Sequence, residues 1–162
     1  MTPMFQPQLA LAPIQLVDYV VVEQGLTVHP DADYDAEQPD GVALGLGLAV
    51  EPTEEGIEII LGMGINEPPP EGADSTQPSN AIYRGRFGIR GHFLWIGADD
   101  LTPEEQRKLL VVNGVSALYG IARVHVRQLS EPLPGPPLIL PMLSFADALD
   151  GLIAAEERNP TA

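Results

Sequence analysis

The sequence predicts an α+β fold: a four-stranded antiparallel sheet, then a broken long helix and a C-terminal helix packed on one face of the sheet. Three observations predict it. Four segments before residue 97 are rich in strand-forming side chains, and three of them alternate cleanly with the period of a strand. Residues 115–129 then repeat apolar side chains with the period of a helix, and a capping box marks the start of the helical region. With 162 residues, the chain is expected to form one domain over 1–162.

The first three strands follow from apolar runs that end at turn residues. Residues 14–28 are dense in Val, Ile and Leu and end at His29-Pro30, where proline removes a ladder donor. Residues 44–50 and 57–65 alternate strictly on either side of the turn at 52–56, which predicts a hairpin. Small residues occupy the second face of this hairpin and suggest close approach of another layer or chain: Gly45, Gly47, Ala49, Gly62 and Gly64.

A proline-rich segment, residues 67–80, separates this hairpin from the fourth strand. It holds four prolines and no apolar periodicity, so an exposed loop is expected. The strand at 81–96 sorts its side chains onto two faces. The apolar face carries Tyr83, Phe87, Ile89, Phe93 and Trp95, and the opposite face carries Arg84, Arg86, Arg90 and His92.

The helical region opens with a well-marked start. Thr102 is a suitable N-cap, Pro103 suits the first helical position, and Glu105 completes the capping box. A break is expected at Asn113-Gly114, followed by the longer amphipathic helix. Residues 132–143 are rich in proline and predict a crossover that is not regular helix. Ser144 is then expected to cap a final helix that closes at Asn159-Pro160.

Charge and composition exclude several classes of partner. The formal net charge is −15, which repels nucleic acid and anionic membrane surfaces. All eight Lys and Arg residues lie at or after Arg84, so residues 1–83 contain acidic side chains but no Lys or Arg. No apolar stretch reaches the 18 or more residues of a spanning helix, and the N-terminus lacks a basic region ahead of its apolar residues. We therefore expect a soluble cytoplasmic protein.

No pattern in the sequence nominates an enzyme, a cofactor or a metal. The chain has no cysteine, and its three histidines show no metal-ligand spacing. Asp31, Asp33 and Asp35 imitate half a calcium loop, but its required glycine and final carboxylate are absent. Gly-x-Gly pairs lie inside strands, and no serine stands in a Gly-x-Ser-x-Gly motif. A binding protein is predicted, and a small-molecule or enzymatic use of an apolar groove is the minor alternative.

Several motifs in the second half carry a family resemblance. Residues 90–96, RGHFLWI, are similar to a strand end with the pattern Gly-x-Phe, and Asn113-Gly114 stands where the family has Cys-Pro. Residues 118–123, LYGIAR, resemble its Phe-Pro-Tyr-Ala-Arg segment. Residues 137–145, PLILPMLSF, resemble its Pro-x-Leu-x-Leu-x-Pro-Val-Asn-Phe segment. The family is that of the SecB-type protein-export chaperones, which also share the order of elements.

The resemblance implies an ATP-independent holdase that binds unfolded or partly folded proteins in apolar grooves, without a cofactor. The client-binding residues it implies are Leu138, Ile139, Leu140, Phe145, Tyr83, Phe93 and Trp95. Family members are tetramers, dimers of dimers, packed largely through the long helix. The oligomer interface it implies comprises Val115, Leu118, Tyr119, Ala122, Val126 and Leu129. Ordinary core packing is the alternative for each of these side chains.

The family docks the SecA motor through an acidic sheet face, and here that face differs. Glu23 matches the first-strand glutamate, but Tyr19 replaces an aspartate, and Arg84 with Arg86 replaces Leu-x-Glu. Two arginines repel a basic partner that two acids attract. Glu23, Arg84 and Arg86 are the expected partner-docking residues, and SecA is a disfavoured partner. Two alternatives stay open: a chaperone that attends a toxin–antitoxin pair, and an interaction module for one specific protein.

Overall fold

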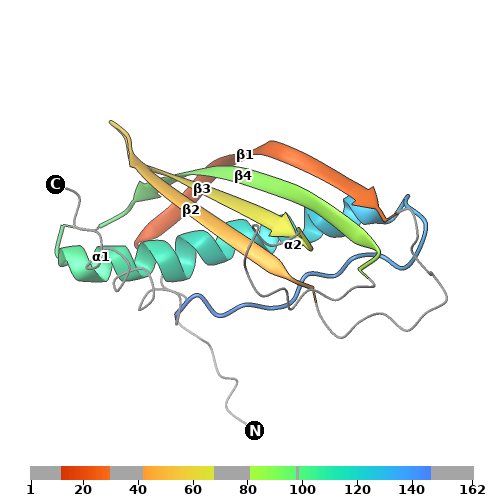
Figure 1. Cartoon of the computed structure of the whole chain (residues 1–162). Helices are drawn as coiled ribbons and strands as arrows, with labels where there is room; N and C mark the ends of the chain where they lie inside the picture. Colours follow the sequence, from red (N-terminus) through yellow and green to blue (C-terminus); the bar gives the residue numbers. More distant parts are fainter. Residues whose placement is uncertain (1–11, 30–41, 68–80, 98, 147–162) are drawn as a thin grey trace, which may run out of the picture.

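Four strands form one antiparallel sheet in the order β1-β4-β3-β2 (Figure 1). The strands are β1 Ile14–Val28, β2 Leu44–Pro52, β3 Ile57–Ile65 and β4 Tyr83–Trp95. The computed structural model describes residues 12–29, 42–67, 81–97 and 99–146. The predicted α+β class, the antiparallel sheet and the hairpin of β2 and β3 are confirmed.

Strand alternation decides which face of the sheet meets the helix. On β3, every second side chain from Ile59 to Ile65 is buried, and the residues between them are only partly covered. On β4, the buried side of the strand holds Tyr83, Phe87, Ile89 and Phe93. These apolar side chains form the core beneath the helix, as their spacing predicts. We call the opposite, helix-free side of the sheet the outer face.

One continuous helical region covers the inner side of the sheet. It comprises α1 Pro103–Leu109, the π-helical segment η1 Leu110–Val115 and α2 Ser116–Ser130. The capping box of Thr102 and Glu105 is present. The expected break at Asn113-Gly114 takes the form of a π-helical segment, and the helical backbone continues through it. Gly114 lies close to the sheet there, because an added Cβ would lie 2.6 Å from Ile59 Cδ1.

Contrary to the expectation that no apolar stretch reaches the length of a spanning helix, the region Pro103–Ser130 is long and apolar enough to cross a membrane by length and composition, with a mean hydropathy of 1.5 in its most apolar window. However, 44% of that window is buried within the chain. Leu118, Ala122 and Val126 belong to the hydrophobic core that the helix shares with the sheet. A core side facing the sheet therefore accounts for part of the apolar character of this helix.

After α2, the chain returns without regular secondary structure along the helix (Figure 1). We call residues 131–146 the strap. The strap occupies the place of the predicted crossover and lacks helix up to Phe145. The predictions of a last helix from Ser144 to Asn159 and of an exposed loop at 67–80 fall mostly on residues 147–162 and 68–80, which lie outside the described residues.

Candidate functional site

The strap is held to the core by side-chain hydrogen bonds from the sheet and the helix. The hydroxyl of Tyr83 on β4 lies 3.0 Å from the carbonyl oxygen of Pro134 and 2.8 Å from that of Pro136. Tyr119 donates to the carbonyl of Pro141 at 2.8 Å, and Arg123 Nε donates to Leu140 O at 3.0 Å. An irregular segment has no ladder to satisfy its carbonyls, so these side chains take that role.

One further contact fixes the beginning of the strap. The Oγ atom of Ser130, a fully buried residue, accepts a hydrogen bond of 2.7 Å from the backbone N–H of Leu138 and donates one of 2.8 Å to Arg127 O. The sequence analysis missed this role because Ser130 stands at the end of an amphipathic helix like any helix-terminal serine. Its partner is eight residues away and is brought close only by the turn of the strap.

The predicted client-binding residues divide into core and surface. Leu138, Leu140, Phe145, Tyr83 and Phe93 are buried in the chain's own core, and Trp95 is half-buried. These six therefore offer a client little or no surface, and core packing explains most of them. Of the seven, Ile139 alone is strongly exposed, at 65%. The strap also exposes Met142, at 84%, and Leu143, at 38%, which the sequence analysis did not select.

The predicted oligomer-interface residues also lie inside the fold. Five of the six are buried: Val115, Leu118, Tyr119, Ala122 and Val126. The sixth, Leu129, is partly buried against the same core. The amphipathic stripe packs against its own sheet, so these side chains are covered by the chain itself. The outward side of α2 instead carries the exposed residues Ala117, Gly120 and Val124.

Strand β1 is a long edge of the sheet with exposed apolar side chains. Val17, Val20 and Val22 are each about half exposed. The register shifts between Leu16 and Asp18 and again between Val21 and Glu23, which places Val17 and Val22 at bulges. An apolar edge strand of this length is a template for pairing with another chain.

The second bulge of β1 also separates two residues that the family pattern places together. Tyr19 lies on the inner side, where its hydroxyl is 3.4 Å from His125 Nε2 of α2 and its ring meets the imidazole edge-on. Glu23 lies four residues later, and uninterrupted alternation would put it on the same face. The extra residue turns Glu23 to the outer face instead, as its pairing with Gly88 indicates. The chain therefore differs from the family pattern in two ways: Tyr19 is not acidic, and Tyr19 and Glu23 lie on opposite faces of the sheet.

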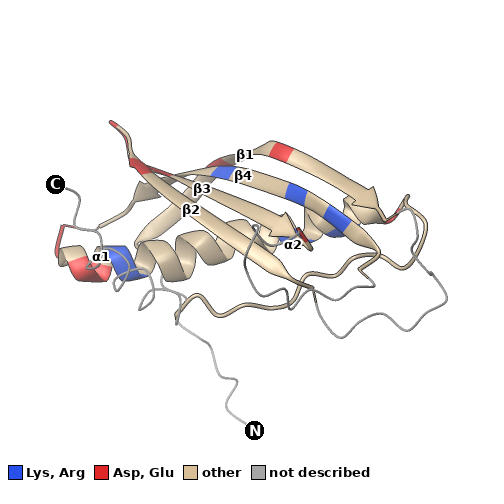
Figure 2. Cartoon of the chain, viewed as in Figure 1, with Lys and Arg blue, Asp and Glu red and all other residues tan. Residues whose placement is uncertain are grey.

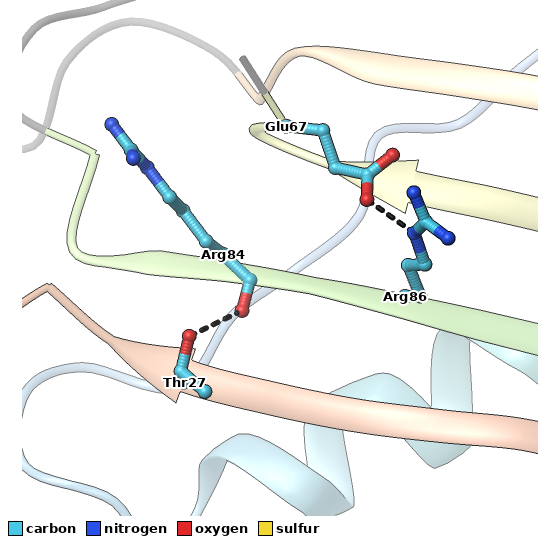
Figure 3. Close-up of polar contacts among 4 residues, drawn as sticks. All are labelled: Thr27, Glu67, Arg84 and Arg86. Carbon is cyan, nitrogen blue, oxygen red and sulfur yellow. Dashed lines mark hydrogen bonds and ion pairs between the residues drawn. The ribbon is translucent and has the colours of Figure 1, made fainter.

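The predicted docking residues are brought together on the outer face. Arg84 and Arg86 stand opposite Thr27 and Gly25 of β1, and Glu23 lies one step along the sheet. Arg86 Nε donates to a carboxylate oxygen of Glu67, a residue that the sequence analysis did not select (Figure 3). This hydrogen bond and the charge of Glu67 raise the pKa of the Arg86 guanidinium, and Glu23 adds to the effect.

Glycines make part of the outer face almost flat. A shallow depression of about 310 Å³ is lined by Gly45, Gly47, Gly62 and Gly64 and bordered by Glu23, Glu67 and Arg86. An added Cβ at Gly45 or Gly47 would meet no atom within 4 Å. Own-chain contacts among the described residues therefore do not require glycine at these two positions. Because Gly45 and Gly47 have no side chains, the backbone of β2 is accessible from the outer face.

The ionisable groups among the described residues, 12–29, 42–67, 81–97 and 99–146, form no cluster of three or more His, Cys, Asp or Glu side chains that could hold a metal ion. Burial raises the pKa of the Tyr119 phenol, and this hydroxyl is already engaged by the strap. What the described surfaces offer is an exposed apolar strap, an open strand edge and a charged, flat sheet face.

Comparison with known proteins supports the fold. No protein-family model matches the chain, and no curated protein sequence matches it. Among solved structures, it is similar to a SecB-like chaperone of Mycobacterium tuberculosis in complex with a ChAD peptide from the HigA1 antitoxin, with a TM-score of 0.53 and 23% identity. The match covers 82% of this chain and 89% of that chain. The strand order, the inner helix and this likeness together show that the chain has a SecB-like fold.

Proposed function

We propose that the chain is an ATP-independent SecB-like chaperone that holds non-native polypeptides. The observation that carries the proposal is the exposed apolar surface of a strap that is itself held in place. Ile139 and Met142 project into solvent while Leu138 and Leu140 anchor the same segment in the core. Such side chains can cover apolar groups of an unfolded client, a contact that needs no nucleotide.

The test is suppression of aggregation by the full chain. A reduced, unfolded model client is diluted into buffer with stoichiometric amounts of the protein, and its light scattering is followed. Several clients should aggregate more slowly. The double variant Ile139→Lys/Met142→Lys should lose most of this effect, because removing two exposed apolar contacts of about 1.5–3 kcal/mol each weakens client binding at least tenfold.

A matched control variant separates the strap from apolar surface in general. Val50→Lys/Ile96→Lys removes two other exposed apolar side chains, on β2 and just after β4. This control should suppress aggregation to the same extent as the unmodified chain does. Failure of the unmodified chain with several clients would refute the chaperone proposal. Equal loss in both double variants would refute the role of the strap.

A second candidate is a chaperone dedicated to one protein, and the structural neighbour favours it. That neighbour is a SecB-like chaperone bound to a peptide from an antitoxin. A dedicated chaperone here would bind one partner segment tightly and would leave unrelated unfolded clients to aggregate. SecA delivery is not part of either proposal, because the outer face carries Arg84 and Arg86 where the family pattern has Leu-x-Glu.

The proposed chaperone is an oligomer that uses surfaces left uncovered by its own fold. Gly120 costs the helix about 1 kcal/mol relative to alanine, yet an added Cβ there would meet nothing within 4 Å. Close approach of a second helix to Ala117, Gly120 and Val124 would explain why a glycine occupies this position. We expect light scattering to give a tetramer of about 70 kDa from 17.4 kDa chains. Val124→Lys should lower this mass, and a monomer of the unmodified chain would refute the oligomer.

A further inference from the structure

Three arginines form a row along the outer face of β4 in a chain that is strongly acidic. Arg84, Arg86 and Arg90, which we call the arginine row, are three of only eight basic residues against 23 acidic ones. Figure 2 shows them following one another along this strand. No helix of the described residues covers this face (Figure 1). Net charge for solubility does not call for such a row, because the chain already carries −15.

The carboxylates beside the row occupy only part of each guanidinium. Glu67 contacts Arg86 through Nε, and the nearest approach of Glu58 to Arg90 is also at Nε, at 3.8 Å. The side chains of Arg86 and Arg90 remain about half exposed or more. Since a guanidinium carries five N–H donors, each arginine retains donors for a second carboxylate.

Arg84 is the least satisfied member of the row. Its Nε atom is buried and has no hydrogen-bond partner among the described residues. In Figure 3, its side chain points away from both Arg86 and Glu67. Because this Nε atom is covered, a carboxylate from another molecule would bind the Nη donors of the same guanidinium.

The spacing of the row fits an extended polymer better than a small anion. Residues two apart on a strand lie about 7 Å apart, so the row from Arg84 to Arg90 spans about 20 Å. No single carboxylate or phosphate reaches all three arginines. An extended polypeptide has the same repeat. Gly62, which pairs with Gly88 between Arg86 and Arg90, has no side chain over it and lets a backbone lie close to the sheet.

Neighbouring acids decide between a polypeptide and a nucleic acid. Glu23, Glu58 and Glu67 flank the row, and a polynucleotide would bring phosphates against them at every step. A polypeptide can place carboxylates over the arginines and neutral or basic side chains over these glutamates. The mixed charge of this face therefore suits a protein segment.

We propose that the outer face docks an extended, acidic segment of a partner protein, with its carboxylates on Arg84, Arg86 and Arg90. This site is separate from the strap and does not depend on the proposed holdase function. The two functions are therefore separable by mutation: changes in the arginine row affect the acidic partner, and changes at Ile139 and Met142 affect unfolded clients.

The test uses the full chain and a fluorescein-labelled peptide of about twelve residues in which Glu and Ser alternate, to match the repeat of an extended strand. Fluorescence anisotropy should show saturable binding at about 50 mM salt that weakens at about 300 mM. Arg84→Gln/Arg86→Gln/Arg90→Gln should weaken binding about tenfold or more, since three charge-assisted contacts are lost. The corresponding triple change to Lys should restore part of the affinity.

The matched control is Arg107→Gln/Lys108→Gln/Arg127→Gln, which removes the same charge from the helices and should bind the peptide as before. Circular dichroism of each variant verifies the fold. The proposal is overturned if the peptide fails to bind, if a Gln-Ser peptide binds equally well, or if the two triple variants lose affinity alike. Tighter binding of a single-stranded oligonucleotide would also overturn it, in favour of nucleic acid.

Discussion

The phenol hydroxyl of Tyr119 in α2 donates a hydrogen bond of 2.8 Å to the carbonyl oxygen of Pro141 in the strap. The ring of Tyr119 is buried and meets that of Phe145 edge-on, with centroids 5.4 Å apart. Together with Arg123 and Ser130, this side chain ties the core helix to the segment that exposes Ile139 and Met142. The rigidity of the proposed client-binding surface therefore depends on a helix residue that faces the interior.

Tyr119→Phe should loosen the strap while the core stays filled. The change removes one hydrogen bond and keeps the ring, so the free energy of unfolding in urea should fall by about 1 kcal/mol. Hydrogen exchange should rise in residues 137–145 more than in the sheet. Tyr19→Phe is the control, because its contact to His125 is long, 3.4 Å, and exposed. Equal effects of the two changes would contradict the role of Tyr119.

The same phenol should make stability sensitive to alkaline pH. Burial raises the pKa of Tyr119 above its ordinary value, and the positive charge of Arg123 opposes this only in part. The contribution of a group whose pKa is raised by folding is fully present below its unfolded pKa, about 10 for tyrosine. It is lost as pH rises through the folded pKa. Unfolding free energies measured from pH 8 to 11 should fall less steeply in Tyr119→Phe than in the unmodified chain, and parallel curves would refute this.

Ser130→Ala should destabilise the chain more than an ordinary change at a helix end. It leaves the backbone N–H of Leu138, a buried donor, without its acceptor at 2.7 Å. An unsatisfied buried donor costs about 1–3 kcal/mol. Urea unfolding measures the loss, with Ser116→Ala at the start of α2 as a control expected to stay within about 0.5 kcal/mol. A loss as small as the control's would mean that water replaces the serine.

Two glycines of the sheet should respond to alanine in opposite ways. At Gly91, a Cβ would lie 2.6 Å from Leu118 Cδ2 and 2.9 Å from Phe93 Cε2, and both of these side chains are buried. Gly91→Ala should cost about 1–3 kcal/mol of stability through overpacking. Gly47→Ala meets open space on the outer face and should be neutral or stabilise by up to about 1 kcal/mol. Thermal unfolding of the two variants gives the comparison, and equal melting temperatures would contradict it.

Local patterns predicted the elements of the fold well. Alternation from Ile57 to Ile65 assigned the correct side chains to the core, and the capping box of Thr102 and Glu105 placed the start of the helix. Asn113-Gly114 signalled an irregularity, which takes the form of a π-helical segment in a continuous helical backbone, with Gly114 close to Ile59 of the sheet. Glycine was selected there by its approach to the sheet.

The roles of the predicted site residues do not follow from residue type alone, for a physical reason. Leu138, Leu140 and Phe145 are apolar whether they face a client or a core, so residue type cannot distinguish the two roles. The helix stripe from Val115 to Val126 is equally suited to the chain's own sheet or to a second copy. By contrast, the residues of the arginine row were correctly placed on one face, because strand alternation fixes the side of the sheet irrespective of what lies on it.

The amino-acid sequence by itself determined the order of the strands and helix along the chain, the two faces of β2, β3 and β4, the acidic charge and the absence of a thiol. These properties depend on neighbours in the chain, where side-chain period and backbone preference act. Only the tertiary structure decided that β1 is an edge strand, that its bulge separates Tyr19 from Glu23, and that Glu67 contacts Arg86. It also decided that Ile139 is exposed while Leu140 is buried. Each of these depends on partners far away in the sequence, which only the folded chain brings into contact.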